Sequence, residues 1–155
     1  MIVPTADDTR QILEQGAEIV ALALAPHGFE FRLLAQGHSS GGTFANGEFV
    51  RGDRRIELHF RYSLGLVEYH LGQLSLAHVD YMRALLGRSH ASQYPSFSDQ
   101  PMAQFEALRQ DLDALCGDFI AGTGDQFRKC IEWHTNYSSL SGIQKLEFDT
   151  RQFRG

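Results

Sequence analysis

Two histidines, His59 and His70, are the residues whose type and spacing most suggest chemistry in this sequence. They lie in two stretches, residues 56–63 and 66–71, in which apolar and polar side chains alternate. Alternation with a period of two is typical of β-strands that have one buried side and one solvent-facing side. In an antiparallel pair, two imidazoles directly opposite each other have Cβ atoms about 5 Å apart, and with a further ligand they can bind a divalent metal.

A turn at Leu64-Gly65 that pairs Ser63 with Leu66 fixes the register of this hairpin. The register sorts apolar side chains to one side of the sheet and polar side chains to the other, and a slip by one residue would mix them. The pairs predicted on the buried side are Tyr62–Val67, Phe60–Tyr69 and Leu58–Leu71, and those on the solvent side are Arg61–Glu68 and His59–His70.

The predicted ligand or metal site comprises His59, His70, Arg61 and Glu68, with His78 from the following segment as a further ligand. The alternative interpretation of these residues is an exposed polar face that carries an Arg61–Glu68 ion pair. No nucleophile–base set and no nucleotide-binding motif accompanies these residues. We therefore predict no catalytic residue and no cofactor, and we favour a protein that is not an enzyme.

Aromatic side chains outside this hairpin are the second set of candidates. Tyr94 and Phe97 flank Pro95 in a polar stretch, and Trp133 is the single tryptophan. Exposed aromatic residues are favoured anchors in protein interfaces. We predict that these three residues bind a partner. The alternative for Tyr94 and Phe97 is that they cover the edge of the core, and for Trp133 it is packing in the core.

The composition suits one domain of moderate size. The chain has 155 residues, of which 43% are hydrophobic, and a formal net charge of −5. A mildly acidic chain without a basic stretch argues against binding to nucleic acid or to an anionic membrane surface. The N-terminal residues lack the pattern of a signal peptide, and no apolar run is long enough to cross a bilayer. We therefore expect a cytoplasmic protein in which Cys116 and Cys130 are buried thiols.

Four strands and several helices are expected in the order helix, four strands, three helices. Thr5 and Asp8 form a capping pair for the first helix, and Gly52-Asp53 is a two-residue hairpin turn. That turn predicts the pairs Phe49–Ile56, Gly47–Leu58, Ala45–Phe60 and Glu48–Glu57. The later helices are expected to begin near Ser75, at Pro101 and near Asp125. Strands followed by helices predict an α+β fold in which the helices pack mainly on one face of an antiparallel meander.

We expect a single α+β domain over residues 1–134 and a weakly structured or docked extension over residues 135–155. The layout is similar to that of small bacterial accessory domains, some immunity proteins of toxin systems among them, although fold alone does not determine function. We favour an accessory or regulatory domain that binds another protein or itself, for example as a homodimer. The alternative is a small-molecule-binding or metal-assisted enzyme that uses the His59 and His70 face.

Overall fold

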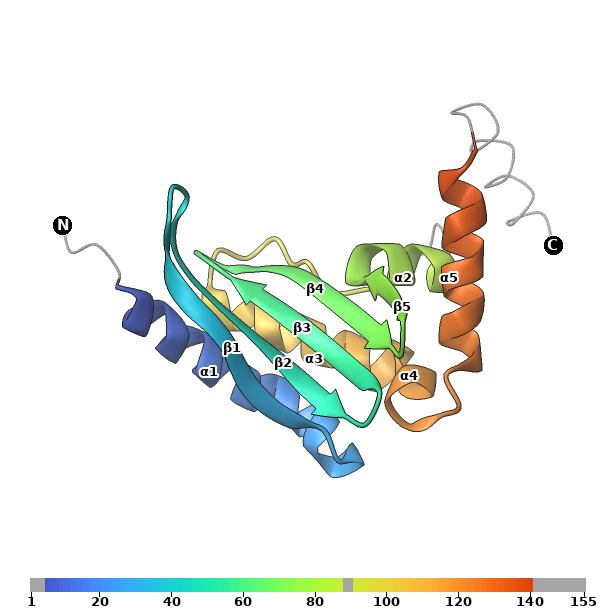
Figure 1. The fold of residues 1–155 in the computed structure, drawn as a ribbon, viewed down its shortest axis with the longest axis horizontal. Helices are drawn as coiled ribbons and strands as arrows, with labels where there is room; N and C mark the ends of the chain where they lie inside the picture. The colour runs from blue at the N-terminus through green and yellow to red at the C-terminus, as the bar shows by residue number, and fades with distance from the viewer. Residues whose placement is uncertain (1–4, 88–90, 141–155) are drawn as a thin grey trace.

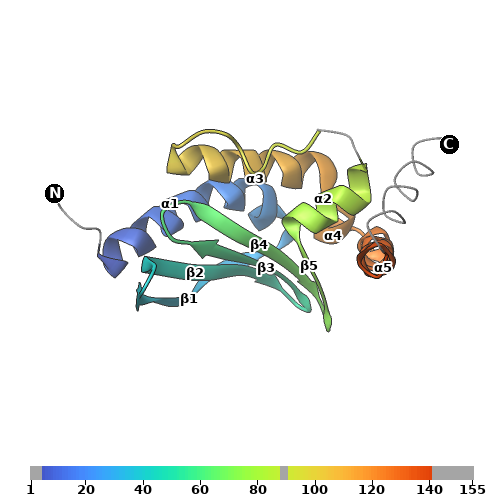
Figure 2. The same ribbon diagram turned by 90° about the horizontal axis from the view of Figure 1, so that it is seen from above.

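The chain folds as an α+β unit in which helices cover one face of an antiparallel sheet (Figures 1 and 2). The structure is a computed structural model that describes residues 5–87 and 91–140. Its elements are α1 (Ala6–Leu24), the 3-10 helix η1 (Ala25–His27), β1 (Glu30–Ser39), β2 (Gly42–Arg51), β3 (Arg54–Phe60), β4 (Leu64–Leu71), β5 (Leu74–Ala77), α2 (His78–Leu86), α3 (Pro101–Leu115), α4 (Gly117–Ala121) and α5 (Asp125–Ser138).

The sheet is a meander with the strand order β1-β2-β3-β4-β5 (Figure 1). It contains one strand more than the sequence predicts, because the short edge strand β5 follows β4 directly. Gly72, between them, has a φ of +59°, which suits a tight turn. The expected helix start near Ser75 is therefore wrong, since Ser75 lies in β5 opposite His70 and α2 begins at His78.

The hairpin between β2 and β3 has the predicted register at every predicted pair. Phe49 faces Ile56, Gly47 faces Leu58, Ala45 faces Phe60 and Glu48 faces Glu57. Gly52 adopts a φ of +58° in the two-residue connection, as the turn requires. A two-residue turn leaves the flanking strands one register, which is why the pairing could be predicted here.

The predicted register of the hairpin between β3 and β4 is wrong. Leu58 pairs with Val67 rather than Leu71, and Phe60 pairs with Leu64 rather than Tyr69. The pairing is displaced along β4 by four residues at Leu58 and by five at Phe60. The apolar side chains of both strands still face the core, because Leu64 is buried beside Phe60 and Val67 is buried beside Leu58. The predicted inward position of Tyr62 is also wrong, because this side chain is 68% exposed beyond the end of β3.

The helices α1 and α3 pack on each other and cover the inner face of the sheet (Figure 2). Their close approach depends on Gly16, where an added Cβ would lie 2.3 Å from the ring of Phe105. The helical pattern from Pro101 to Ala121 is interrupted at Cys116, so α3 and α4 are separate helices. Cys116 and Cys130 are buried free thiols, as predicted.

The last helix, α5, packs against α2, α4 and β5 at the side of the sheet rather than on its face (Figures 1 and 2). It continues to Ser138 and so includes the first residues of the segment 135–155 that the sequence separates from the domain. Residues 141–155 lie outside the described residues, and their docking stays a prediction. None of the described helices combines the length and apolarity that crossing a bilayer requires.

Candidate functional site

The face of the sheet opposite α1 and α3, here called the outer face, carries a chain of ion pairs. The Glu48 carboxylate accepts hydrogen bonds from Arg32 Nε at 2.7 Å and from Arg55 Nη1 at 2.9 Å. Glu48 is fully buried although no described helix covers this face, because the two guanidinium groups enclose its carboxylate. Arg55 also lies 3.5 Å from Glu57, so it separates two carboxylates that the register places directly opposite each other.

His59 and His70 are not a cross-strand pair, and this prediction is wrong. The shifted register places His70 opposite Arg55. The two imidazoles instead approach one carboxylate, with Nε2 of His70 at 3.0 Å and Nε2 of His59 at 3.3 Å from Glu57. The predicted pairing of Arg61 with Glu68 is wrong too, since Glu68 lies 3.9 Å from His70 and Arg61 contacts the β1–β2 turn.

His78 lies on the other side of the sheet and does not join His59 and His70. Its ring is buried, with Nδ1 2.7 Å from the Tyr69 hydroxyl and Nε2 2.9 Å from Asp111 Oδ2. In the described part of the chain, no group of three or more His, Cys, Asp or Glu side chains is arranged to hold a metal ion. The predicted ligand set thus divides between an outer face with His59, His70, Arg61 and Glu68 and a core with His78.

The Asp111 carboxylate is the centre of the buried polar cluster around His78. It accepts hydrogen bonds from the Ser92 hydroxyl at 2.7 Å, from the Gln93 amide at 2.6 Å and from the Tyr94 amide at 3.0 Å. Burial acts to raise the pKa of Asp111, but the hydrogen bonds from His78, from the two amides and from Ser92 outweigh it and lower that pKa.

An Asp–His–Tyr arrangement of this kind can relay a proton, but here it is enclosed by the core. Asp111, His78 and Tyr69 are each exposed by 1% or less, so solvent and substrate do not reach them. The cluster joins β4, α2, α3 and the segment before α3. The sequence contains a signal for it: Asp111 lies between Leu108 and Leu112 on the apolar side of α3, where a lone carboxylate needs buried partners.

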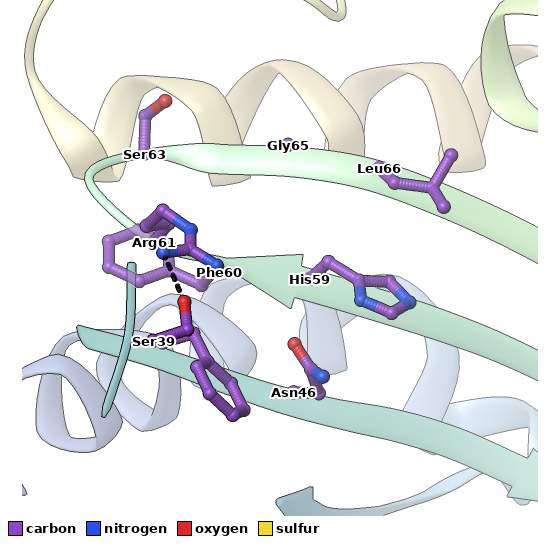
Figure 3. A pocket seen from close by; sticks show the side chains of 9 residues that line it. Ser39, Asn46, His59, Phe60, Arg61, Ser63, Gly65 and Leu66 are labelled. Atoms are coloured by element: carbon purple, nitrogen blue, oxygen red, sulfur yellow. Dashed lines mark hydrogen bonds between the residues drawn. The ribbon is translucent and has the colours of Figure 1, made fainter. Parts of the chain in front are cut away.

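A cavity of about 450 Å³ opens on the outer face at the end of the sheet that carries the β3–β4 turn (Figure 3). Asn46 on β2 and His59 on β3 lie side by side as register partners, and Leu66 lies beyond them on β4 (Figure 3). The remaining lining residues are Ser39, Phe44, Phe60, Arg61, Ser63 and Gly65. The cavity therefore combines apolar walls with several hydrogen-bonding groups, as ligand sites do.

A β-bulge shapes this cavity. Leu58 pairs with Val67 and Phe60 with Leu64, so Gly65 and Leu66 together face the single residue His59. Bulges redirect side chains and are common beside functional sites. The shift that makes the predicted register wrong also places Leu66 at the cavity, where it is 47% exposed. The alternation breaks at the bulge, since Gly65 and Leu66 are both exposed between the buried Leu64 and Val67. The sequence does not locate this break, because Leu64-Gly65 also fits a turn.

Of the two partner-binding residues predicted around Pro95, Tyr94 is buried and Phe97 is exposed. Tyr94 is 6% exposed, and its hydroxyl hydrogen-bonds the Leu64 carbonyl at 2.8 Å, so it covers the core edge. Phe97 is fully exposed. Its neighbours are held by the buried Gln104, which accepts a hydrogen bond from the Ser96 amide at 2.9 Å and donates to the carbonyls of Ser96 and Ser98 at 2.9 and 2.8 Å.

Trp133, the third predicted partner-binding residue, is half-buried on α5. Its ring stacks on Tyr137 with a centroid distance of 4.9 Å and an interplanar angle of 10°. It also borders a smaller cavity of about 230 Å³ between α2 and α5, with Leu85 and Cys130 among the lining residues. Trp133 therefore packs within this helix pair and is not brought together with Phe97.

Comparison with protein-family models, with curated proteins and with solved structures finds no match to this chain.

Proposed function

We propose that this protein is a non-enzymatic accessory domain that binds a protein partner, either another protein or a second copy of itself, through Phe97. The observation that carries the proposal is the complete exposure of this phenylalanine on a segment that is held in place on both sides. Burying a phenylalanine side chain is favourable by about 1.5–3 kcal/mol of free energy. The isolated chain does not gain this free energy, because the ring is in water.

The support of the Phe97 segment is stronger than that of an ordinary surface loop. Upstream, Asp111 accepts from the amides of Gln93 and Tyr94, and downstream Gln104 holds the backbone of Ser96 and Ser98. Both acceptor side chains lie on α3 and are buried. An anchor that is already fixed loses little conformational entropy when a partner binds, so more of the burial energy appears as affinity.

The experiment compares the wild type with Phe97→Ser and with Leu22→Ser, a matched control because Leu22 is a 61% exposed apolar residue on α1. Light scattering after size-exclusion chromatography reports self-association, and affinity capture from the source cells followed by mass spectrometry reports other partners. We expect a dimer or a captured protein that Phe97→Ser abolishes and Leu22→Ser retains. A strict monomer that captures nothing, or an assembly that Leu22→Ser alone removes, contradicts the proposal.

Small-molecule binding on the outer face is the alternative function, and the cavity beside His59 favours it. The cavity falls within the usual size range of ligand sites, about 300–1,000 Å³. The outer face has one carboxylate, Glu57, in contact with both His59 and His70, and this arrangement by itself supplies no nucleophile. The alternative is therefore a binding role and not a hydrolytic one.

A further inference from the structure

We infer that the cavity beside His59 binds an oxyanion, a carboxylate or a phosphate, that is carried on a small apolar body. The inference concerns the outer face and does not depend on Phe97. It rests on three features of the cavity: the charge of its lining, the position of Arg61, and the unused hydrogen-bonding capacity of the neighbouring side chains.

The lining has a positive charge and no carboxylate, although the whole chain is acidic. Arg61 is the formal cation of the lining, and within the described residues it forms no salt bridge. The other arginines of the outer face, Arg32 and Arg55, are both paired with Glu48. An arginine without a counter-ion beside a cavity is suited to bind an anion, because the ion supplies the missing partner.

The Arg61 guanidinium is held in a fixed position by one of its ends. Nη1 donates to the Ser39 hydroxyl at 2.9 Å (Figure 3) and to the Gly42 carbonyl at 3.2 Å. The guanidinium carbon lies 5.9 Å from the centre of the Phe44 ring. Across the parts of the chain that the structure describes, Nε and Nη2 have no hydrogen-bond partner. These two nitrogens form the edge that binds carboxylate or phosphate through two parallel hydrogen bonds.

Three further side chains of the lining have hydrogen-bonding atoms that the described part of the protein leaves unused. They are the Asn46 amide, the Ser63 hydroxyl and Nδ1 of His59, whose Nε2 is occupied by Glu57. Phe44 and Leu66 supply apolar surface at the same cavity. Hydrogen-bonding groups and apolar walls in one cavity suit a ligand that has an oxyanion head and a short aromatic or aliphatic body.

The experiment titrates the isotopically labelled protein with benzoate and with phenyl phosphate and follows backbone amide signals by NMR at low ionic strength. Benzyl alcohol has a similar body without the charge and is the control ligand. We expect saturable shifts at residues 39–46 and 59–66 with at least one of the two anions. Tighter binding of benzoate identifies a carboxylate ligand, and tighter binding of phenyl phosphate identifies a phosphate ligand. Equal binding of benzyl alcohol, or no binding of either anion, overturns the inference.

Two pairs of variants assign the effect to the cavity. Arg61→Gln is expected to weaken anion binding about tenfold or more, because it removes a charge-assisted bidentate contact, whereas Arg128→Gln on α5 makes the same charge change and leaves binding unaltered. Leu66→Lys should strengthen binding and Leu66→Glu should weaken it, since both place a charge at the cavity. Wild-type affinity in Arg61→Gln, or equal affinities in the two Leu66 variants, overturns the inference. Phe97→Ser retains anion binding, which keeps this test separate from that of the partner surface.

Discussion

The hydroxyl of Tyr94 hydrogen-bonds the main-chain carbonyl of Leu64 at 2.8 Å and also lies within hydrogen-bond distance of the Gly65 carbonyl. This contact ties the segment before α3 to the beginning of β4, where the bulge opposite His59 lies. The exposed Phe97 and the cavity on the outer face therefore share one support, although they lie on different elements. A substitution of Tyr94 should therefore affect both the Phe97 segment and the cavity.

Tyr94→Phe is expected to lower the free energy of unfolding by about 1 kcal/mol, the usual contribution of one such hydrogen bond. It should also weaken benzoate binding, because Leu64 and Gly65 lose the contact that holds the bulge. Urea denaturation and the NMR titration measure the two effects. The control is Tyr62→Phe, which removes an exposed hydrogen bond of 3.0 Å to the Gly41 carbonyl. Equal effects in the two variants would show that the Tyr94 contact has no special role.

Asp111→Ala is expected to destabilise the protein by about 3–5 kcal/mol, as measured by urea denaturation. The substitution leaves His78, Ser92 and two backbone amides without their shared acceptor in a buried environment. Asp113→Ala is the matched control on the same helix, where the carboxylate is 51% exposed and pairs with Arg109. A surface change of that kind costs less than about 0.5 kcal/mol. Similar losses in both variants would contradict the buried role of Asp111.

Stability should fall on the alkaline side from about pH 9 upward. Burial raises the pKa of Cys130 to about 11 and the pKa of Cys116 and Tyr94 to about 12. In the unfolded chain these groups titrate near 8.5 for cysteine and 10 for tyrosine, so the unfolded state loses its protons first and is favoured as the pH rises. Thermal unfolding at increasing pH measures this, and Cys130→Ala should make the decline shallower.

On the acid side, the pKa of Asp111 is lowered in the folded protein and returns to about 3.9 on unfolding. The unfolded state therefore takes up its proton first, and the stability that this carboxylate contributes is lost as the pH falls below about 4. Asp111→Asn should flatten the acid limb of the same thermal series. An acid limb that is as steep in Asp111→Asn as in the wild type would assign the acid sensitivity to other carboxylates.

The sequence predicts those parts of the structure that neighbouring residues determine. The β2–β3 register follows from two adjacent residues, Gly52 and Asp53, and each of its predicted pairs is confirmed. The β3–β4 register does not, because the chain turns through Arg61, Tyr62 and Ser63 and then adds a bulge. The alternation of Val67, Tyr69 and Leu71 fits both registers, because opposite Leu58 and Ile56 the two registers differ by an even number of residues. The break in alternation between the buried Leu64 and Val67 is hidden in the sequence, because Leu64-Gly65 also fits a turn.

The candidate sites show the same division between local and long-range constraints. The alternation places His59 and Arg61 on the solvent-facing side of the strand, and both residues line the cavity. Which of Tyr94 and Phe97 is exposed could not be predicted, since it depends on the buried acceptors Gln104 and Asp111 on α3. The sequence does not predict the buried role of His78 for a related reason, because its partners Tyr69 and Asp111 come from a strand and a distant helix.

Phe97→Ser should leave the free energy of unfolding within about 0.5 kcal/mol of the wild type, because a fully exposed side chain contributes little to the isolated fold. Phe105→Ala provides the contrast, since this ring is fully buried against Gly16 and its loss should cost about 3–5 kcal/mol. Urea denaturation of both variants makes the comparison. A large loss in Phe97→Ser would show that the ring packs on the protein in solution.

Site-specific photo-crosslinking tests the partner-binding proposal most directly. The photoreactive amino acid p-benzoylphenylalanine is placed at position 97 and, in a control protein, at position 22, where the native leucine is 61% exposed. Both proteins are irradiated in the source cells, and the adducts are identified by mass spectrometry. The account predicts a discrete adduct, with another protein or with a second copy of this chain, at position 97 and not at position 22. No adduct at position 97, or the same adducts at both positions, would contradict it.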